Sequence, residues 1–148
     1  MSKVSAFILM TLAISLLSCP VHAMDEGGQY IHIDQMVIRF DHADAMVTLN
    51  YDLGVFAKVY VFAFGSRHLE PELGTIFSDY NNVEMLEIGH DHAVILLKNA
   101  SRKNGMFYLH DQRELGATIG SLDIQYPTGS SKNIRNADSV PNLFYEPT

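Results

Sequence analysis

The chain has 148 residues, with 10 basic and 17 acidic side chains and a formal net charge of −7. This length indicates a single domain. The acidic charge, without a clustered basic patch, disfavours nucleic acid and anionic membrane surfaces as partners. The one cysteine, Cys19, lies near the N-terminus. The rest of the chain therefore folds without disulfides and offers no thiol nucleophile.

Residues 1–23 are predicted to be a cleaved signal peptide. A basic residue, Lys3, precedes the uncharged stretch Val4–Ser18, and a cleavage site of small residues ends at Ala23. Cleavage there removes Lys3 and leaves nine basic against 17 acidic side chains, a charge of −8. We therefore expect residues 24–148 to form one exported domain, secreted or held in the cell envelope (periplasm or cell surface).

Two other fates of the N-terminus remain open. The sequence Leu16–Cys19 (LLSC) resembles a lipobox, in which Cys19 becomes the lipidated first residue of a bacterial-type lipoprotein, although Pro20 follows it directly. The uncharged residues from Val4 to Met24 can also remain as a membrane anchor, against which Pro20 and His22 argue. After removal of the leader we expect no membrane insertion.

The first element expected in the mature chain is a β-hairpin. Tyr30–Phe40 alternates apolar and polar residues, with a one-residue shift near Gln35 that is typical of a β-bulge. Asp41–Asp44 is a polar turn, and Ala45–Tyr51 alternates again.

Residues 53–64 fit either a helix or a strand, because they are apolar except at Gly54 and Lys58. As a helix, the segment would begin after Asp52 as N-cap, end at Gly65 with positive φ, and be nearly buried. As a strand, its β-branched and aromatic residues also fit. We favour the helix, because the narrow polar stripe and both end signals agree. The run is shorter than the roughly 20 apolar residues that span a bilayer.

A second helix is predicted over residues 69–78, where apolar residues recur at helical spacing and Pro71 suits the first turn. Gly65 and Ser66 would form the corner between the two helices.

The second half of the chain predicts mostly strands. Strands are expected at 83–88, 93–98, 106–109, 119–126 and at the edge of a sheet over 131–136, with a helical turn at 110–116 and a docked tail at Leu143–Tyr145. Hairpins imply antiparallel pairing. The predicted fold is therefore α+β, with a single antiparallel sheet built from β-hairpins and one central helical stretch (about 53–78) packed on one face.

Histidine next to carboxylate is the most suggestive chemical pattern. Imidazole and carboxylate groups bind zinc and other divalent metals, and residues two apart in a strand point the same way. The candidate ligands are His32, Asp34, His90, His92 and His110. The alternative is that several of them are ordinary turn residues, and no HExxH spacing is present.

No catalytic signature supports an enzyme. There is no GxSxG motif, although a Ser-His-Asp triad assembled from distant positions stays open. Asn99 begins an N-glycosylation triplet in a predicted loop.

The sequence therefore favours a non-catalytic binding or structural-interaction domain, with an unidentified protein partner in the envelope and no cofactor. One alternative is a small metal-dependent hydrolase that uses the His/Asp clusters. Another is an apolar small-ligand carrier, with aromatic side chains lining a cavity between helix and sheet.

Overall fold

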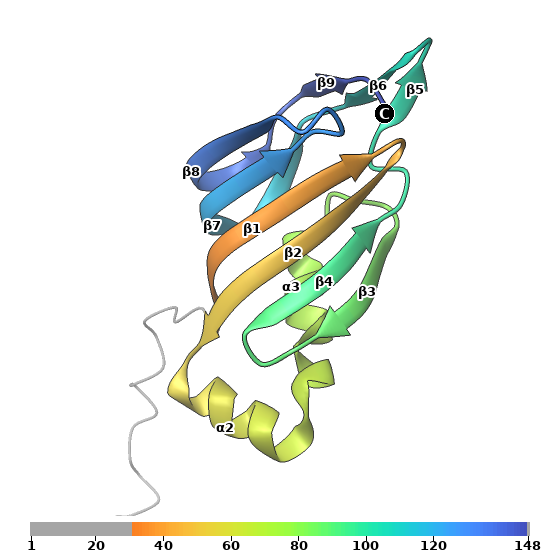
Figure 1. Ribbon diagram of the computed structural model, residues 1–148. Helices are drawn as coiled ribbons and strands as arrows, with labels where there is room; N and C mark the ends of the chain where they lie inside the picture. The colour runs from red at the N-terminus through yellow and green to blue at the C-terminus, as the bar shows by residue number, and fades with distance from the viewer. Residues whose placement is uncertain (1–30, 148) are drawn as a thin grey trace, which may run out of the picture.

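The structure is a computed structural model that describes residues 31–147. This part of the chain has α+β architecture, as predicted, with a six-stranded mixed sheet, a small three-stranded sheet and two α-helices (Figure 1). The predicted leader, including Cys19, lies outside the described residues. The elements in order are β1 (Ile31–Asp41), β2 (Asp44–Leu53), α2 (Val55–Phe64), the 3-10 helix η1 (Ser66–Leu69), α3 (Glu70–Ile76), β3 (Val83–Ile88), β4 (His92–Leu97), β5 (Arg102–Asn104), β6 (Phe107–His110), β7 (Arg113–Gln125), β8 (Ser131–Val140) and β9 (Leu143–Tyr145).

The prediction of a single antiparallel sheet is wrong. The large sheet has the order β3-β4-β2-β1-β7-β8, in which β1 and β7 run parallel, and β5, β6 and β9 form a second sheet. Hairpin patterns identify neighbours in sequence, which pair antiparallel. They carry no information about the partner of β1 some 80 residues along the chain, where Gln35 lies opposite Ser121.

The first hairpin and its bulge are confirmed. β1 and β2 pair antiparallel from Ile31 opposite Leu53 to Asp41 opposite Asp44, with a register shift between Ile33 and Gln35. The shift keeps the apolar residues on one side, so that both strands bury one face.

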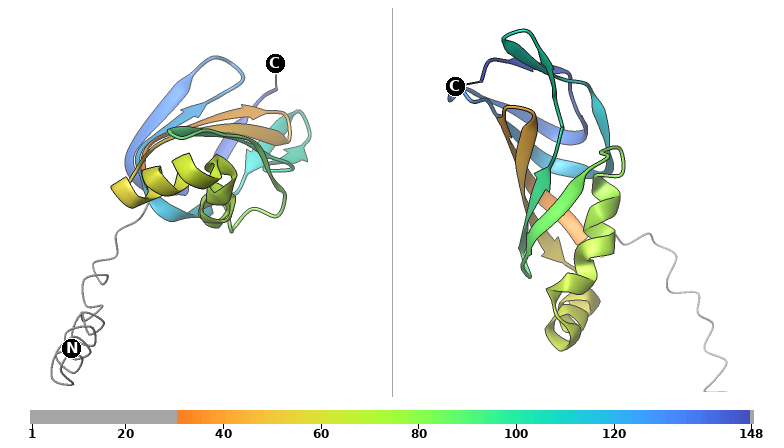
Figure 2. Two further views of the ribbon diagram at one scale, coloured as in Figure 1. Left: turned by 90° about the horizontal axis from the view of Figure 1, so that it is seen from below. Right: turned by 90° about the vertical axis from the view of Figure 1, so that its right-hand side faces the viewer.

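The helical stretch divides into two parts with different surroundings. α3 lies across one face of the large sheet, whereas α2 projects beyond the end of the sheet (Figure 2). α3 contributes Leu73 and Ile76 to the core, with Phe77 directly after it. The prediction of a helix within residues 53–64 is confirmed over Val55–Phe64, although Leu53 belongs to β2. Its expected burial is wrong, because Val61 is its one buried residue. β2 ends at Leu53 on the sheet's end, so the next helix starts where no sheet remains to cover it.

The ends of α2 were predicted in part. Gly65 ends the helix with φ of +91°, as predicted. Asp52 is not the N-cap, because Gly54 holds that position without a side-chain hydrogen bond. The Asp52 carboxylate instead lies 2.9 Å from Lys58 Nζ.

The helical turn expected at residues 110–116 is also wrong. His110 ends β6, and Arg113 begins the long strand β7, where it lies opposite Val140 of β8. Burial of Leu115 against the core holds this segment extended.

The small sheet covers the end of the core that α3 leaves open. Phe40 of β1 packs against Tyr145 of β9, with ring centroids 5.2 Å apart, and against His110 of β6 at 5.0 Å. The docked tail is thus confirmed as strand β9, which pairs with β6.

Gly116 controls how closely α3 approaches β7. A Cβ at residue 116 would lie 2.3 Å from the backbone oxygen of Thr75 in α3. We expect Gly116→Ala to lower the free energy of unfolding by about 1–3 kcal/mol, the usual cost of overpacking a core contact, as measured by urea denaturation.

Gly74→Ala is the matched control, since a Cβ there meets nothing within 4 Å. This helical substitution should raise stability by up to about 1 kcal/mol. Equal stabilities of the two variants would contradict the close contact.

Candidate functional site

The most unusual surface is the exposed apolar side of α2. Phe62 is 94% exposed and Phe56 is 85% exposed, although large apolar side chains are normally covered. Contiguous exposed apolar patches of this kind mark binding sites. The exposed large apolar residues of α2 are Val55, Phe56, Val59, Tyr60, Phe62 and Phe64, which we call the α2 face.

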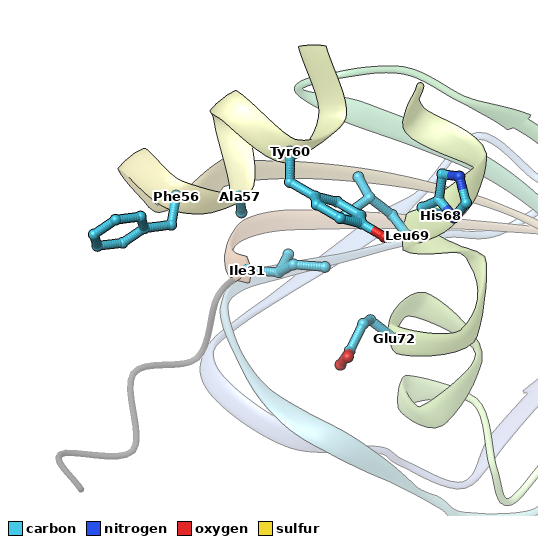
Figure 3. Close-up of a pocket in the computed structure, with 7 residues that line it drawn as sticks. All are labelled: Ile31, Phe56, Ala57, Tyr60, His68, Leu69 and Glu72. Atoms are coloured by element: carbon cyan, nitrogen blue, oxygen red, sulfur yellow. The ribbon is translucent and has the colours of Figure 1, made fainter. Parts of the chain in front are cut away.

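A pocket of about 280 Å³ opens beside the α2 face. It lies between α2, the η1–α3 segment and the start of β1, and its walls are mainly apolar (Figure 3). The Tyr60 ring points toward Leu69, the Glu72 carboxylate lies on the opposite side from α2, and Phe56 points away from the cavity (Figure 3). The lining residues are Ile31, Phe56, Ala57, Tyr60, His68, Leu69 and Glu72.

An aromatic group stiffens the junction between α2 and η1. The rings of Tyr60 and Phe64 lie 4.9 Å apart, and each meets His68 nearly edge-on, at 5.6 and 6.2 Å. The Ser66 hydroxyl donates a 2.5 Å hydrogen bond to the Ile88 carbonyl, which ties this corner to the end of β3. These contacts hold α2 and the pocket in a fixed position relative to η1 and β3.

α2 carries one charged side chain, and an ion pair neutralises its charge. Lys58 is the only charged residue within the helix, and it pairs with Asp52. The hydrogen bond from Lys58 lowers the pKa of the Asp52 carboxyl. The α2 face is therefore close to neutral.

The first pair of predicted metal ligands, His32 and Asp34, lies at the exposed start of β1. Their Nε2 and Oδ1 atoms are 3.6 Å apart. They do point the same way, as strand geometry predicts, but their side chains are 69% and 60% exposed.

The second pair, His90 and His92, lies at the turn between β3 and β4. His92 Nδ1 lies 2.8 Å from Asp91 Oδ1, and its Nε2 lies 3.3 Å from Glu87 Oε1. Hydrogen bonds to these two carboxylates raise the pKa of His92. His90 Nε2 lies 3.6 Å from the second carboxylate oxygen of Asp91, Oδ2.

The fifth predicted ligand, His110, is 1% exposed and belongs to the core. Its Nδ1 lies 2.8 Å from the Ala100 carbonyl, which can only accept, so Nδ1 carries the proton. Nε2 then accepts from the Tyr80 hydroxyl at 3.3 Å. Both ring nitrogens are thus engaged, and burial lowers the pKa of His110.

The described residues do not gather these side chains into one site. Between residues 31 and 147, no group of three or more His, Cys, Asp or Glu side chains lies close enough to hold a metal ion. The glycosylation candidate Asn99 follows β4 in a turn with φ of +54°, exposed to solvent. The lipidation candidate Cys19 lies outside the described residues.

Sequence reasoning missed the exposure of α2. It placed Phe56, Tyr60, Phe62 and Phe64 in the core or in a cavity beneath the helix, and only two of them line the pocket. One signal was available, because a helix that is apolar all round needs a cover on every side.

Comparisons with known proteins give no family for this chain, because no family model, curated protein or solved structure matches it. Among residues 31–147, no helix has the length and apolar character needed to cross a membrane.

The two histidines with shifted pKa values should act on stability in opposite pH ranges. The lowered pKa of His110 means that, below about pH 6.5, the unfolded chain binds a proton that the folded chain resists. The free energy of unfolding therefore falls as pH decreases below about 6.5. His110→Gln should make this fall shallower in urea titrations at successive pH values.

His92→Gln is the counterpart. The raised pKa of His92 means that the folded chain binds a proton more tightly than the unfolded chain. Its contribution is complete below about pH 6.5 and is lost as pH rises through the folded pKa. His92→Gln should remove this loss and leave the acid limb unchanged. An unaltered acid limb in His110→Gln would contradict the buried neutral imidazole.

Proposed function

We propose that the chain is an exported, non-catalytic binding domain that uses the α2 face as its docking element. The carrying observation is the exposure of Phe56 and Phe62 on a helix with one buried residue. Burying a large apolar side chain contributes about 1.5–3 kcal/mol. Several such side chains on one short helix provide enough energy for a specific contact.

The remaining surface supports this choice over an enzyme. The predicted metal ligands lie in separate places, and His110 is committed to Ala100 and Tyr80. The acidic charge of residues 24–148 keeps such a domain soluble before it binds. The aromatic junction with His68 holds α2 in place, and fixed aromatic residues are common in binding surfaces.

Replacing exposed apolar side chains of the α2 face that lie outside the aromatic junction should abolish docking without unfolding the domain. Phe56→Ser, Val59→Ser and Phe62→Ser combined should change stability little for each exposed site. Purified residues 24–148 should sediment with isolated cell-envelope fragments, which contain both lipid and protein. The triple variant should stay in the supernatant.

The matched control changes apolar residues at the other end of the molecule. Met106 and Phe144 are 78% and 58% exposed. Met106 lies in the turn between β5 and β6, and Phe144 lies in β9; these strands are at the other end of the molecule from α2 (Figure 1). Met106→Ser with Phe144→Ser should sediment like the parent chain. Equal sedimentation of parent and triple variant would refute docking through α2.

A small apolar ligand carrier is a second candidate, which the 280 Å³ pocket favours. Ala57 lines the pocket and Phe62 does not. If the pocket binds ligand, Ala57→Leu should remove the fluorescence enhancement of N-phenyl-1-naphthylamine, and Phe62→Ser should preserve it. The reverse result would assign dye binding to the exposed face and refute the carrier.

A further inference from the structure

We infer that the partner of the α2 face is a lipid bilayer surface, into which α2 inserts as a shallow interfacial helix. This inference rests on the proposed docking role of α2 and names its occupant. It replaces our expectation from the sequence that the chain does not insert into a membrane after removal of the leader. A lipid surface is favoured by the shape of the exposed helix, by its neutrality and by the place where the chain enters the domain.

The exposed apolar surface is convex and broad. With 3.6 residues per turn, the exposed apolar side chains of α2 extend over roughly 200° of the helix circumference. Phe62 and Phe64 lie at the two limits of this arc, and Phe56 lies near its centre. A flat protein surface would cover only part of the arc, whereas acyl chains can surround it completely.

A second copy of the chain fits the α2 face less well than a bilayer does. A ten-residue helix is about 15 Å long and about 10 Å wide. Its exposed arc therefore offers an area on the order of 300 Å², against about 800 Å² for each partner in a stable interface. The α2 face alone is too small for a stable dimer but sufficient for membrane partitioning.

The polar groups at the edge of the α2 face suit the membrane interface. Lys58 pairs with Asp52, so insertion brings no uncompensated charge with the helix. The Lys58 stem can lie along the apolar surface while its ammonium stays in water.

The chain enters the domain next to the α2 face. Ile31, the first described residue, lines the same pocket as Phe56 and Tyr60. Only six residues separate Ile31 from the apolar stretch Val4–Met24. A fully extended chain of this length reaches about 25 Å. While that stretch is in a membrane, during export or as an anchor, α2 is within reach of the same surface.

A single tryptophan tests the inference, because the chain contains none. The described fold lies within residues 24–148, so this form carries all of it. We would place Trp in the α2 face by Phe62→Trp and, as control, on the small sheet by Phe144→Trp. With protein-free phosphatidylcholine vesicles, the tryptophan at 62 should shift its emission to the blue and be quenched by acyl-brominated lipid. The tryptophan at 144 should show neither change.

The energetic test is the vesicle-bound fraction in flotation. Phe56→Ser in the Phe62→Trp background should weaken partitioning by about tenfold or more, as expected for losing a buried phenyl ring. The Phe62→Trp protein should also bind more weakly to vesicles that contain anionic phosphatidylglycerol than to vesicles of phosphatidylcholine alone. The reason is electrostatic repulsion, because residues 24–148 carry a charge of −8 after loss of Lys3.

Two results would overturn the inference in different ways. An unchanged spectrum with vesicles, together with loss of envelope sedimentation in the triple variant, would assign the α2 face to a protein partner and leave the proposed docking role intact. A blue shift that depends on protein concentration without vesicles, with a dimer in sedimentation velocity, would make a second copy the occupant.

Discussion

The parallel pairing of β1 with β7 is the contact on which the rest of the fold depends. It joins the first hairpin to the C-terminal strands and places β1 in the interior of the large sheet. The two strands approach closely at Gly120, where a Cβ would lie 2.7 Å from the Asp34 carbonyl oxygen. A glycine in β7 thus faces the bulge in β1, so the irregularities of the two strands fit each other.

Contact with β7 also distinguishes the buried helix from the exposed one. β7 passes beneath α3 at Gly116, and this contact holds α3 against the sheet. α2 starts where β2 ends and has no comparable contact. A ten-residue helix is marginal in isolation, and α2 buries only Val61. It is therefore the helix with the least support from the core, and any surface that covers it would also stabilise it.

Much of the secondary structure could be predicted, because it depends on the order of apolar, polar and glycine residues within each segment. Alternation and the shift at Gln35 gave β1 and its bulge, and the positive φ of Gly65 ended α2 as expected. The parallel partner of β1 could not be predicted, because its register depends on packing between distant segments. For the candidate site, the sequence identified the apolar residues of α2 but not their exposure, since periodicity shows which residues share a face and not what lies opposite. The role of His110 could not be predicted for the same reason. The sequence suggested a metal ligand, whereas the side chain is buried against Phe40 and Tyr80.

The polar side of the large sheet differs from the α2 face, because several of its side chains hydrogen-bond to one another. On the open side of the sheet, Asn50 donates to Gln35, which donates to Asp123 at 2.8 Å, and Asn133 donates to the same carboxylate at 2.6 Å. This row of hydrogen bonds crosses four strands and lowers the pKa of the Asp123 carboxyl.

At the far end of the molecule, Phe107 and Phe144 stack on each other with centroids 4.4 Å apart. Phe56 and Phe62 differ, because no aromatic ring of the described residues packs on them, and they are 85% and 94% exposed against 58% for Phe144. Water around an exposed phenyl ring is released when the ring is covered, and this is the main driving force for association. Under the proposed docking role this driving force acts at α2, and the entry of the chain beside α2 favours a membrane as the surface that covers Phe56 and Phe62.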